Sequence, residues 1–239
     1  DWVDEPELAG THILRVLRDV EHPERVWAAT VDGLWVVNGD AAATLQKPMD
    51  FSVRHFAQRQ DGLFLLIGFD GAQPVARLGE QSMELPTETG SMKIVGSDEK
   101  GRFYLRFPAG TTDRLARVSE DGVEVLLPST GLIRDFASFG GNLYLLLRDG
   151  ISWSSDDGST WSLPEGEAIR CLRRGPNGFY ACPEPASEEA LLYAPSLPTE
   201  PKSWQWESTL DFDEITEHIC NKNSTVGEIC PELWNTVAQ

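Results

Sequence analysis

The sequence predicts an all-β protein made of five repeated units, each containing four short strands. Two features recur together along the 239-residue chain: a basic residue in an apolar strand, and an apolar-aromatic pair shortly after it. Units of about 40 residues have the length of a four-stranded β-propeller blade. The 21 Gly and 15 Pro are spread along the chain, as short strands and tight turns require. The pairs that mark the second strands are Val26-Trp27, Leu63-Phe64, Phe103-Tyr104, Leu143-Tyr144 and Phe179-Tyr180.

The basic residue marks the first strand of each unit, which in a propeller is the innermost one. Successive basic residues are separated by 39, 39, 41 and 36 residues. We therefore expect them at one equivalent position in every unit. They are Arg15, Arg54, Lys93, Arg134 and Arg170, in expected strands at 13–17, 52–56, 91–95, 132–136 and 168–172.

The third and outer strands complete each unit. A single four-stranded sheet has two apolar faces and cannot bury both of them, so stacking of neighbouring units must supply the core. We therefore expect one domain. Third strands are expected at 34–36, 75–77, 115–117, 151–153 and 191–193, and outer strands near 44–45, 83–85, 123–125, 161–163 and 204–206.

A turn motif lies between the third and outer strands of the fourth unit. Asp156 is placed to accept hydrogen bonds from following backbone N–H groups, Gly158 to adopt a positive φ, and Trp161 to bury its ring beneath the hairpin. The pattern Ser-x-Asp-x-Gly-x-Thr-Trp resembles the Asp-box, or BNR repeat, of β-propellers such as sialidases and sortilin-type receptors. Residues 119–122 are a degenerate copy. The structural residues of the motif are Ser154, Asp156, Gly158, Thr160 and Trp161.

The repeats divide the chain into three parts: an N-terminal extension, a propeller and a tail. The tail, with a short helix expected near Pro231, would pack across the propeller as a cap. Asp-box propellers more often have six or seven blades, which is compatible with further blades before residue 1. The expected boundaries are 1–10, 11–208 and 209–239, with blades at about 11–48, 50–88, 90–129, 131–165 and 167–208.

The four cysteines form two local sets. Cys171 and Cys182 flank a turn centred on residues 176–177, which places them opposite each other on neighbouring strands. Cys220 and Cys230 enclose a turn-rich part of the tail. Two disulfides would indicate an oxidising compartment, hence an extracellular or periplasmic protein. The alternative is four separate buried thiols. The spacings match no zinc motif.

Charge and hydropathy exclude several classes of partner. The 38 acidic and 20 basic residues give a net charge of -18, which repels nucleic acid and anionic membrane surfaces. No apolar run is long enough to span a membrane, and the first residues lack the features of a signal peptide, which we take to be removed. The four histidines have no ligand-like spacing. We therefore expect a monomer with no metal and no cofactor.

The five basic residues are the candidate binding site. Placed at one height around a central channel, they would form a ring, and two such charges about 8 Å apart repel by roughly 2 kcal/mol. One interpretation is that the ring binds an anion, either a small molecule or an acidic segment of a partner protein. The other is that carboxylates such as Asp19, Asp135 and Glu167 neutralise it in structural ion pairs.

The sequence favours a non-enzymatic binding or interaction propeller. The resemblance to sialidases implies a second hypothesis, a glycoside hydrolase acting on acidic sugars. Against it, the Arg-Ile-Pro sequence of sialidases is absent, and all four tyrosines are assigned to strand cores. A third hypothesis is an assembly or scaffold propeller that docks a protein through its rim, resembling photosystem II assembly factors. We assign no catalytic residue.

Overall fold

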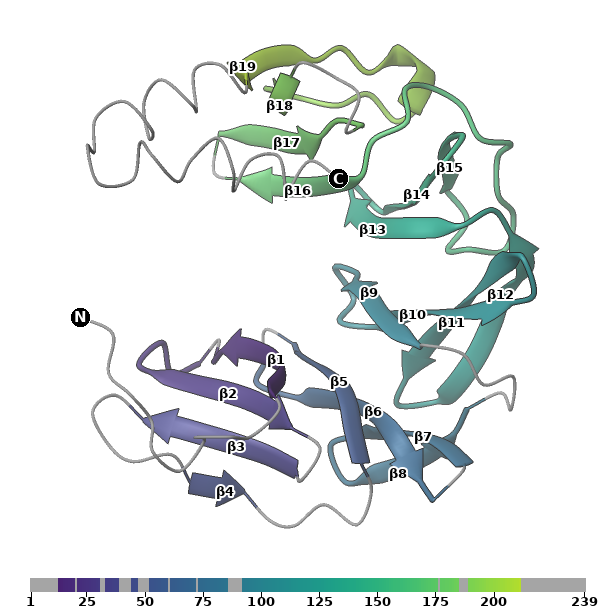
Figure 1. Cartoon of the computed structure of the whole chain (residues 1–239). Helices are drawn as coiled ribbons and strands as arrows, with labels where there is room; N and C mark the ends of the chain where they lie inside the picture. The colour runs from purple at the N-terminus through teal and green to yellow at the C-terminus, as the bar shows by residue number, and fades with distance from the viewer. Residues whose placement is uncertain are drawn as a thin grey trace. The chain divides into compact units, whose positions relative to one another are not determined.

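The structure, a computed structural model, describes residues 13–19, 21–30, 33–38, 44–46, 52–59, 61–71, 73–85, 92–175, 177–184 and 189–211. Within these ranges the regular structure is β-strand, apart from the 3-10 helix Pro201–Ser203. Five antiparallel sheets follow one another along the chain, four with four strands and one with three (Figure 1). They confirm the predicted fold class, an all-β β-propeller with five blades. The expected extension, the helix near Pro231 and the Cys220–Cys230 pair lie outside the described residues.

Contacts divide the chain into two compact units, and the first, Asp1–Thr130, contains three blades. In each blade the strands pair in chain order, so every connection within a blade is a hairpin. The first blade comprises β1 (Ile13–Arg18), β2 (Arg25–Thr30), β3 (Gly33–Asn38) and β4 (Thr44–Gln46). The second comprises β5 (Ser52–Gln58), β6 (Phe64–Asp70), β7 (Gln73–Leu78) and β8 (Gln81–Glu84), and the third β9 (Lys93–Ser97), β10 (Phe103–Ala109), β11 (Thr112–Ser119) and β12 (Gly122–Thr130).

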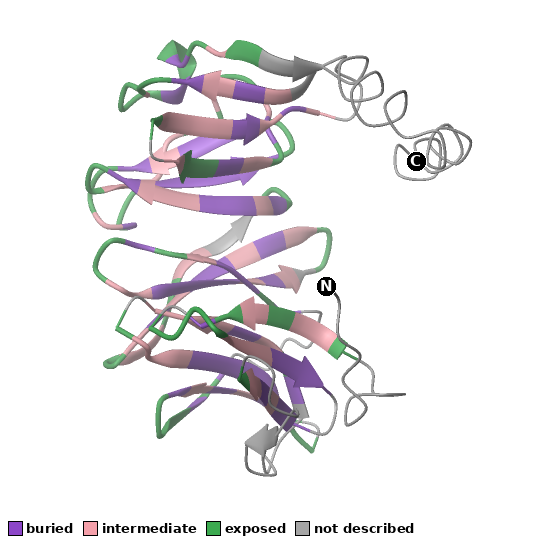
Figure 2. Ribbon diagram, turned by 90° about the vertical axis from the view of Figure 1, so that its left-hand side faces the viewer, coloured by how far each residue is buried: buried purple, intermediate pink, exposed green. Residues whose placement is uncertain are grey.

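The second unit, Gly131–Gln239, contains the remaining two blades. The fourth blade comprises β13 (Ile133–Phe139), β14 (Asn142–Leu147) and β15 (Gly150–Ser154), and the fifth β16 (Cys171–Gly175), β17 (Gly178–Cys182), β18 (Glu189–Ala194) and β19 (Glu207–Asp211). The second strands of the second, third and fourth blades are largely buried, while many turn residues are exposed (Figure 2). A strand covered on both faces reads as a continuous apolar run, as Leu143–Leu147 of β14 does.

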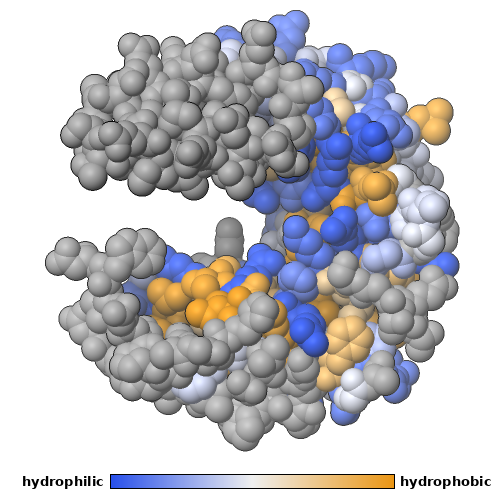
Figure 3. Space-filling view, in the orientation of Figure 1, coloured by the Kyte–Doolittle hydropathy of each residue, from blue (hydrophilic) through white to orange (hydrophobic). Residues whose placement is uncertain are grey.

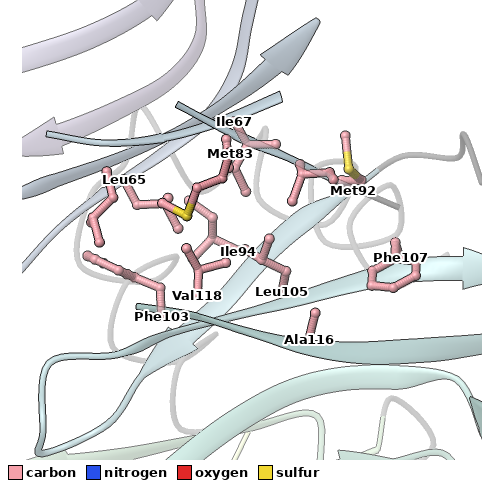
Figure 4. Packing of buried hydrophobic residues seen from close by; sticks show 13 residues of the cluster. Leu65, Ile67, Met83, Met92, Ile94, Phe103, Leu105, Phe107, Ala116 and Val118 are labelled. Atoms are coloured by element: carbon pink, nitrogen blue, oxygen red, sulfur yellow. The ribbon is translucent and has the colours of Figure 1, made fainter. Parts of the chain in front are cut away.

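The core of the first unit lies between successive blades, as the repeat requires. Ala29 and Leu34 of the first blade pack against Val53, Phe56 and Leu66 of the second. The opposite face of the second blade contributes Leu65, Ile67 and Met83 to a larger cluster with the third blade, which supplies Ile94, Phe103 and Leu105 among others (Figure 4). Side chains of alternate residues in β6 therefore serve two different interfaces.

The core of the second unit is rich in aromatic rings. Phe139 stacks on Tyr144 with ring centroids 4.3 Å apart, and Trp204 lies 5.3 Å from Tyr144. Both polar ring atoms are satisfied, because Tyr144 donates to the carbonyl of Thr199 and the Trp204 indole donates to that of Pro198. The Tyr144 bond attaches the segment before β19 to the fourth blade, and the Trp204 bond lies within that segment.

Three expected strands differ from those observed. Residues 161–163 run beside β15 but form no ladder, because the Trp153 N–H donates to the Ser162 hydroxyl instead of to a carbonyl. The outer strand of the fifth blade begins at Glu207, since the 3-10 helix and the buried Trp204 occupy the expected position. The innermost strand of that blade begins at Cys171, three residues later than expected.

The predicted Cys171–Cys182 disulfide is confirmed. The two residues are directly opposite in the β16–β17 pair, with Cα atoms 5.0 Å apart. The bridge closes a loop with a sequence separation of 11 residues. Because it links two strands that already pair, it fixes the register of this hairpin.

We predict that Cys171→Ala/Cys182→Ala lowers the free energy of unfolding of the second unit by about 3 kcal/mol, since the open chain gains loop entropy. Chemical denaturation followed by near-ultraviolet circular dichroism measures this, with thiol reductant tested on both proteins. An unchanged transition midpoint in the variant would contradict the prediction.

Candidate functional site

The turn between β15 and the following segment has the hydrogen bonds expected from the motif. Asp156 accepts bonds from the Thr160 N–H (2.9 Å) and hydroxyl (2.6 Å), and these bonds lower the pKa of its carboxyl. The Ser154 hydroxyl accepts from the Gly158 N–H at 2.9 Å, and Gly158 has a φ of 89°. The half-buried Trp161 donates to the Gly158 carbonyl. All of these contacts are internal to the turn, so its role is structural.

A buried carboxylate organises the β1–β2 turn. Asp19 accepts bonds from the backbone N–H groups of Glu21 and His22, and from the Trp27 indole at 2.7 Å. It also lies 3.5 Å from the Arg25 guanidinium. Gln58 at the end of β5 donates to it at 3.1 Å, so the bond network joins the first blade to the second. Although burial raises the pKa of Asp19, the hydrogen bonds outweigh it and lower the pKa to about 2.

The β9–β10 turn repeats this arrangement with Asp98. Its carboxylate accepts bonds from the N–H groups of Lys100 and Arg102, from the Arg102 side chain at 2.7 Å, and from the Tyr104 hydroxyl at 2.9 Å. Burial is the main cause that raises the pKa of Tyr104, and the charge of Asp98 adds to it. Asp19 and Asp98 are therefore structural anchors whose acceptor positions are occupied.

We predict that Asp19→Asn lowers the free energy of unfolding by about 1–3 kcal/mol at neutral pH, because buried donors lose their charged acceptor. The folded-state pKa near 2 lies below the unfolded value near 3.9, so wild type loses this stability as pH falls through that interval. Acid unfolding followed by fluorescence measures both effects. The exposed Asp121→Asn is the matched control, and identical acid profiles for wild type and Asp19→Asn would contradict the assignment.

The five basic residues of the predicted ring do not occupy one equivalent position. The β5–β6 and β13–β14 ladders each skip one residue of the innermost strand, and these residues are Arg54 and Arg134. In β1 the skipped residue is Leu14, so Arg15 is one position further along. A shift of one residue turns a side chain to the other face of a strand. The prediction that Arg15 is equivalent to Arg54 and Arg134 was therefore wrong by one residue. Arg170 lies just before β16 rather than within it.

The first unit nevertheless gathers cations around one side chain, His55 of β5. Burial is the main cause that lowers the pKa of His55, and the charges of Arg15, Lys93 and Arg106 lower it further. Lys93 and Arg106 are directly opposite in the β9–β10 pair, an arrangement that is unfavourable for like charges. We call Arg15, His55, Lys93 and Arg106 the basic cluster.

Only one of the three cations in the basic cluster has an ion-pair partner among the described residues. Arg106 lies 3.3 Å from the buried Asp113. Arg15 and Lys93 pair with no described carboxylate, and partial burial lowers the pKa of Arg15. Arg54 is exposed at its bulge and is likewise without a described ion-pair partner. Among the described residues, the positive charge of Arg15 and Lys93 is therefore not balanced by an ion pair, although the net charge of the chain is -18.

The basic residues of the second unit are arranged differently. Arg134 forms an ion pair with Glu184, and burial followed by the charge of Arg170 lowers its pKa. Asp135, next in sequence, binds Arg173 of β16 at 2.5 Å and accepts a bond from the Leu172 N–H. Here the alternative of structural ion pairs holds for Arg134 and Asp135, although the cation that Asp135 binds is not one of the predicted five. Arg170 and Glu167 are exposed.

A polar groove of about 460 Å³ lies in the first unit between the β5–β6, β9–β10 and β11–β12 turns. Arg59 crosses it, held by Asp61 at 2.5 Å and Glu120 at 3.3 Å. Gly101, with a φ of 77°, lies under this side chain, and a Cβ there would lie 2.5 Å from Arg59 Cδ. The Arg59–Glu120 ion pair in the groove lining therefore links the second and third blades.

The described part of the chain contains neither a candidate metal cluster nor a candidate membrane span. No group of three or more His, Cys, Asp or Glu side chains could hold a metal ion there. No helix in that part is long and apolar enough to cross a bilayer. Tyr104 and Tyr144 are buried with raised pKa values, about 12 for Tyr144, which is the reverse of what an activated nucleophile requires.

Sequence reasoning missed two members of the basic cluster, His55 and Arg106. Arg106 could have been predicted as a member, because it lies in the strand expected to pair with the strand of Lys93. His55 directly follows Arg54, but only the bulge in β5 determines which of the two lies among the cations. A register irregularity of this kind has no clear mark in the sequence.

Comparisons with known proteins agree with the propeller fold. No protein-family model and no curated protein matches the chain. Among solved structures, the AfRom2 CNH domain matches with a TM-score of 0.53 and 9% identity, over 85% of this chain and 74% of that one. A GH74 enzyme of Niastella koreensis matches with a TM-score of 0.52 and 13% identity, over 82% and 31%. YCF48 bound to D1 peptide matches with a TM-score of 0.50 and 12% identity, over 83% and 67%.

These likenesses define the chain as a β-propeller protein and show the fold alone, because the identities are low. The chain spans less than a third of the GH74 enzyme's length.

Proposed function

We propose that this chain is a non-enzymatic binding propeller that recognises an anionic group through the basic cluster of its first unit. The observation that carries the proposal is that Arg15 and Lys93 lie near His55 without a described carboxylate partner. Cations held near one another cost stability, and an anion bound among them would remove that cost. The ligand is a carboxylate, sulfate or phosphate group, carried by a small molecule or by an acidic segment of a partner protein.

A solved structure with a similar fold contains a bound peptide. The structure of YCF48 is of that protein bound to D1 peptide, and its propeller resembles this one at a TM-score of 0.50. We therefore include an acidic peptide among the test ligands. Docking through the rim, the scaffold hypothesis, would leave the basic cluster unused.

The hydrolase hypothesis is not favoured. Asp135, the carboxylate that the sequence places beside Arg134, is already engaged by Arg173. The likeness to a GH74 enzyme extends to the fold only.

We propose an extracellular or periplasmic location, since the Cys171–Cys182 disulfide persists in oxidising compartments.

The test is a thermal-shift titration with sulfate, phosphate, citrate, sialic acid, a neutral sugar and an acidic peptide at constant ionic strength. We expect a saturable rise in Tm with at least one anion and none with the neutral sugar, because a ligand that binds only the folded state stabilises it, by about 2.7 kcal/mol at a hundredfold excess over Kd. In Arg15→Ala/Lys93→Ala the rise should disappear, while the Tm without ligand stays the same or increases.

The matched control is Arg18→Ala/Lys100→Ala, which removes the same charge from exposed positions of the first unit outside the basic cluster. It should keep the anion response. Equal responses in both double variants, or no anion-specific rise in wild type, would refute recognition through the cluster.

A further inference from the structure

His55 is the one member of the basic cluster whose charge changes near neutral pH. Its ring is half-buried, and its Nδ1 atom is shielded from water without a hydrogen-bond partner. A neutral imidazole tolerates this environment, because the unprotonated nitrogen carries no hydrogen to satisfy. A protonated ring would place an N–H there without a described acceptor, which is unfavourable for a buried donor.

Among the described residues, the charged groups around His55 are mostly cations. β1 contributes Arg15 and β9 contributes Lys93, while Arg106 of β10 is paired with Asp113 of β11. β6 places Ile67 opposite His55, β3 has no titratable side chain, and Arg25 of β2 lies beside Asp19 at the turn. On β5 itself the neighbouring charge is Arg54, which is exposed. Each facing charge therefore opposes protonation, apart from the already paired Asp113.

We propose that His55 makes anion binding by the basic cluster dependent on pH, with an oxyanion bound more tightly when the imidazole is protonated. This inference rests on the proposed function. A bound anion supplies the negative charge that the surroundings lack, so it offsets the repulsion between the imidazolium and the neighbouring cations. Binding and proton uptake are then coupled, and each favours the other.

The sign of the effect follows from linkage. In the free protein the pKa of His55 is lowered by burial first and by the cations second, and a bound anion opposes the second cause. Between the free and the bound pKa, affinity rises as pH falls, at most about tenfold per pH unit. Above both values it is constant. The ligand would therefore bind more tightly as the solution becomes more acidic through this interval.

The test is isothermal titration calorimetry with sulfate between about pH 5.5 and about pH 8, at constant ionic strength. Sulfate keeps both charges across this interval, so a change in affinity reports on the protein. We expect tighter binding at the acid end for wild type and a flat profile for His55→Gln. The matched control is His22→Gln, which changes an exposed histidine of the β1–β2 turn and should retain the wild-type profile.

A second readout does not depend on a variant. Repeating the wild-type titration near pH 6 in two buffers of different ionisation enthalpy gives the number of protons taken up on binding, which we expect to be positive and to vanish near pH 8. Sulfate binding without proton uptake and without pH dependence would overturn the role of His55 while leaving the proposed function intact. If sulfate and the other anions fail to bind at every pH, both proposals fall.

Discussion

The need to bury both faces of every sheet governs this structure. A four-stranded antiparallel sheet with apolar side chains on both sides is stable only when neighbours cover it. The second blade shows the result most clearly, since Leu66 of β6 belongs to one core cluster and Leu65 and Ile67 to another. Ile13 and Val16 of β1 nevertheless expose apolar side chains. Figure 3 shows apolar residues gathered on part of the visible surface.

Buried carboxylates hold the turns that this stacking leaves exposed. At the β1–β2 and β9–β10 turns, Asp19 and Asp98 each accept backbone N–H groups and lie beside a guanidinium. Asp135 lies within β13 instead, where it accepts the Leu172 N–H and binds Arg173 of β16. Burying these carboxylates costs little stability, because hydrogen bonds and ion pairs compensate their charge. In contrast to these carboxylates, Arg15 and Lys93 of the basic cluster have no carboxylate partner among the described residues.

Much of the fold was readable from the sequence, since it depends on features that repeat. The period of the basic and aromatic residues identified the blades, and the Cys171–Cys182 spacing identified a hairpin register that the disulfide confirms. The features that the sequence could not predict depend on local irregularities of single strands. Bulges at Leu14, Arg54 and Arg134 changed which side chains are equivalent. The Ser162 hydroxyl replaced a ladder bond, and Trp204 joined the core instead of a strand.

The disulfide in the fifth blade has a consequence for covalent continuity. Cys171 and Cys182 lie at the ends of β16 and β17 away from the turn, and Asn177 in that turn is exposed. A protease that cuts the turn would leave the two fragments bonded to each other and still paired along the whole hairpin. The cleaved protein would thus migrate as one chain in denaturing electrophoresis until a reductant is added. The fifth blade would stay assembled.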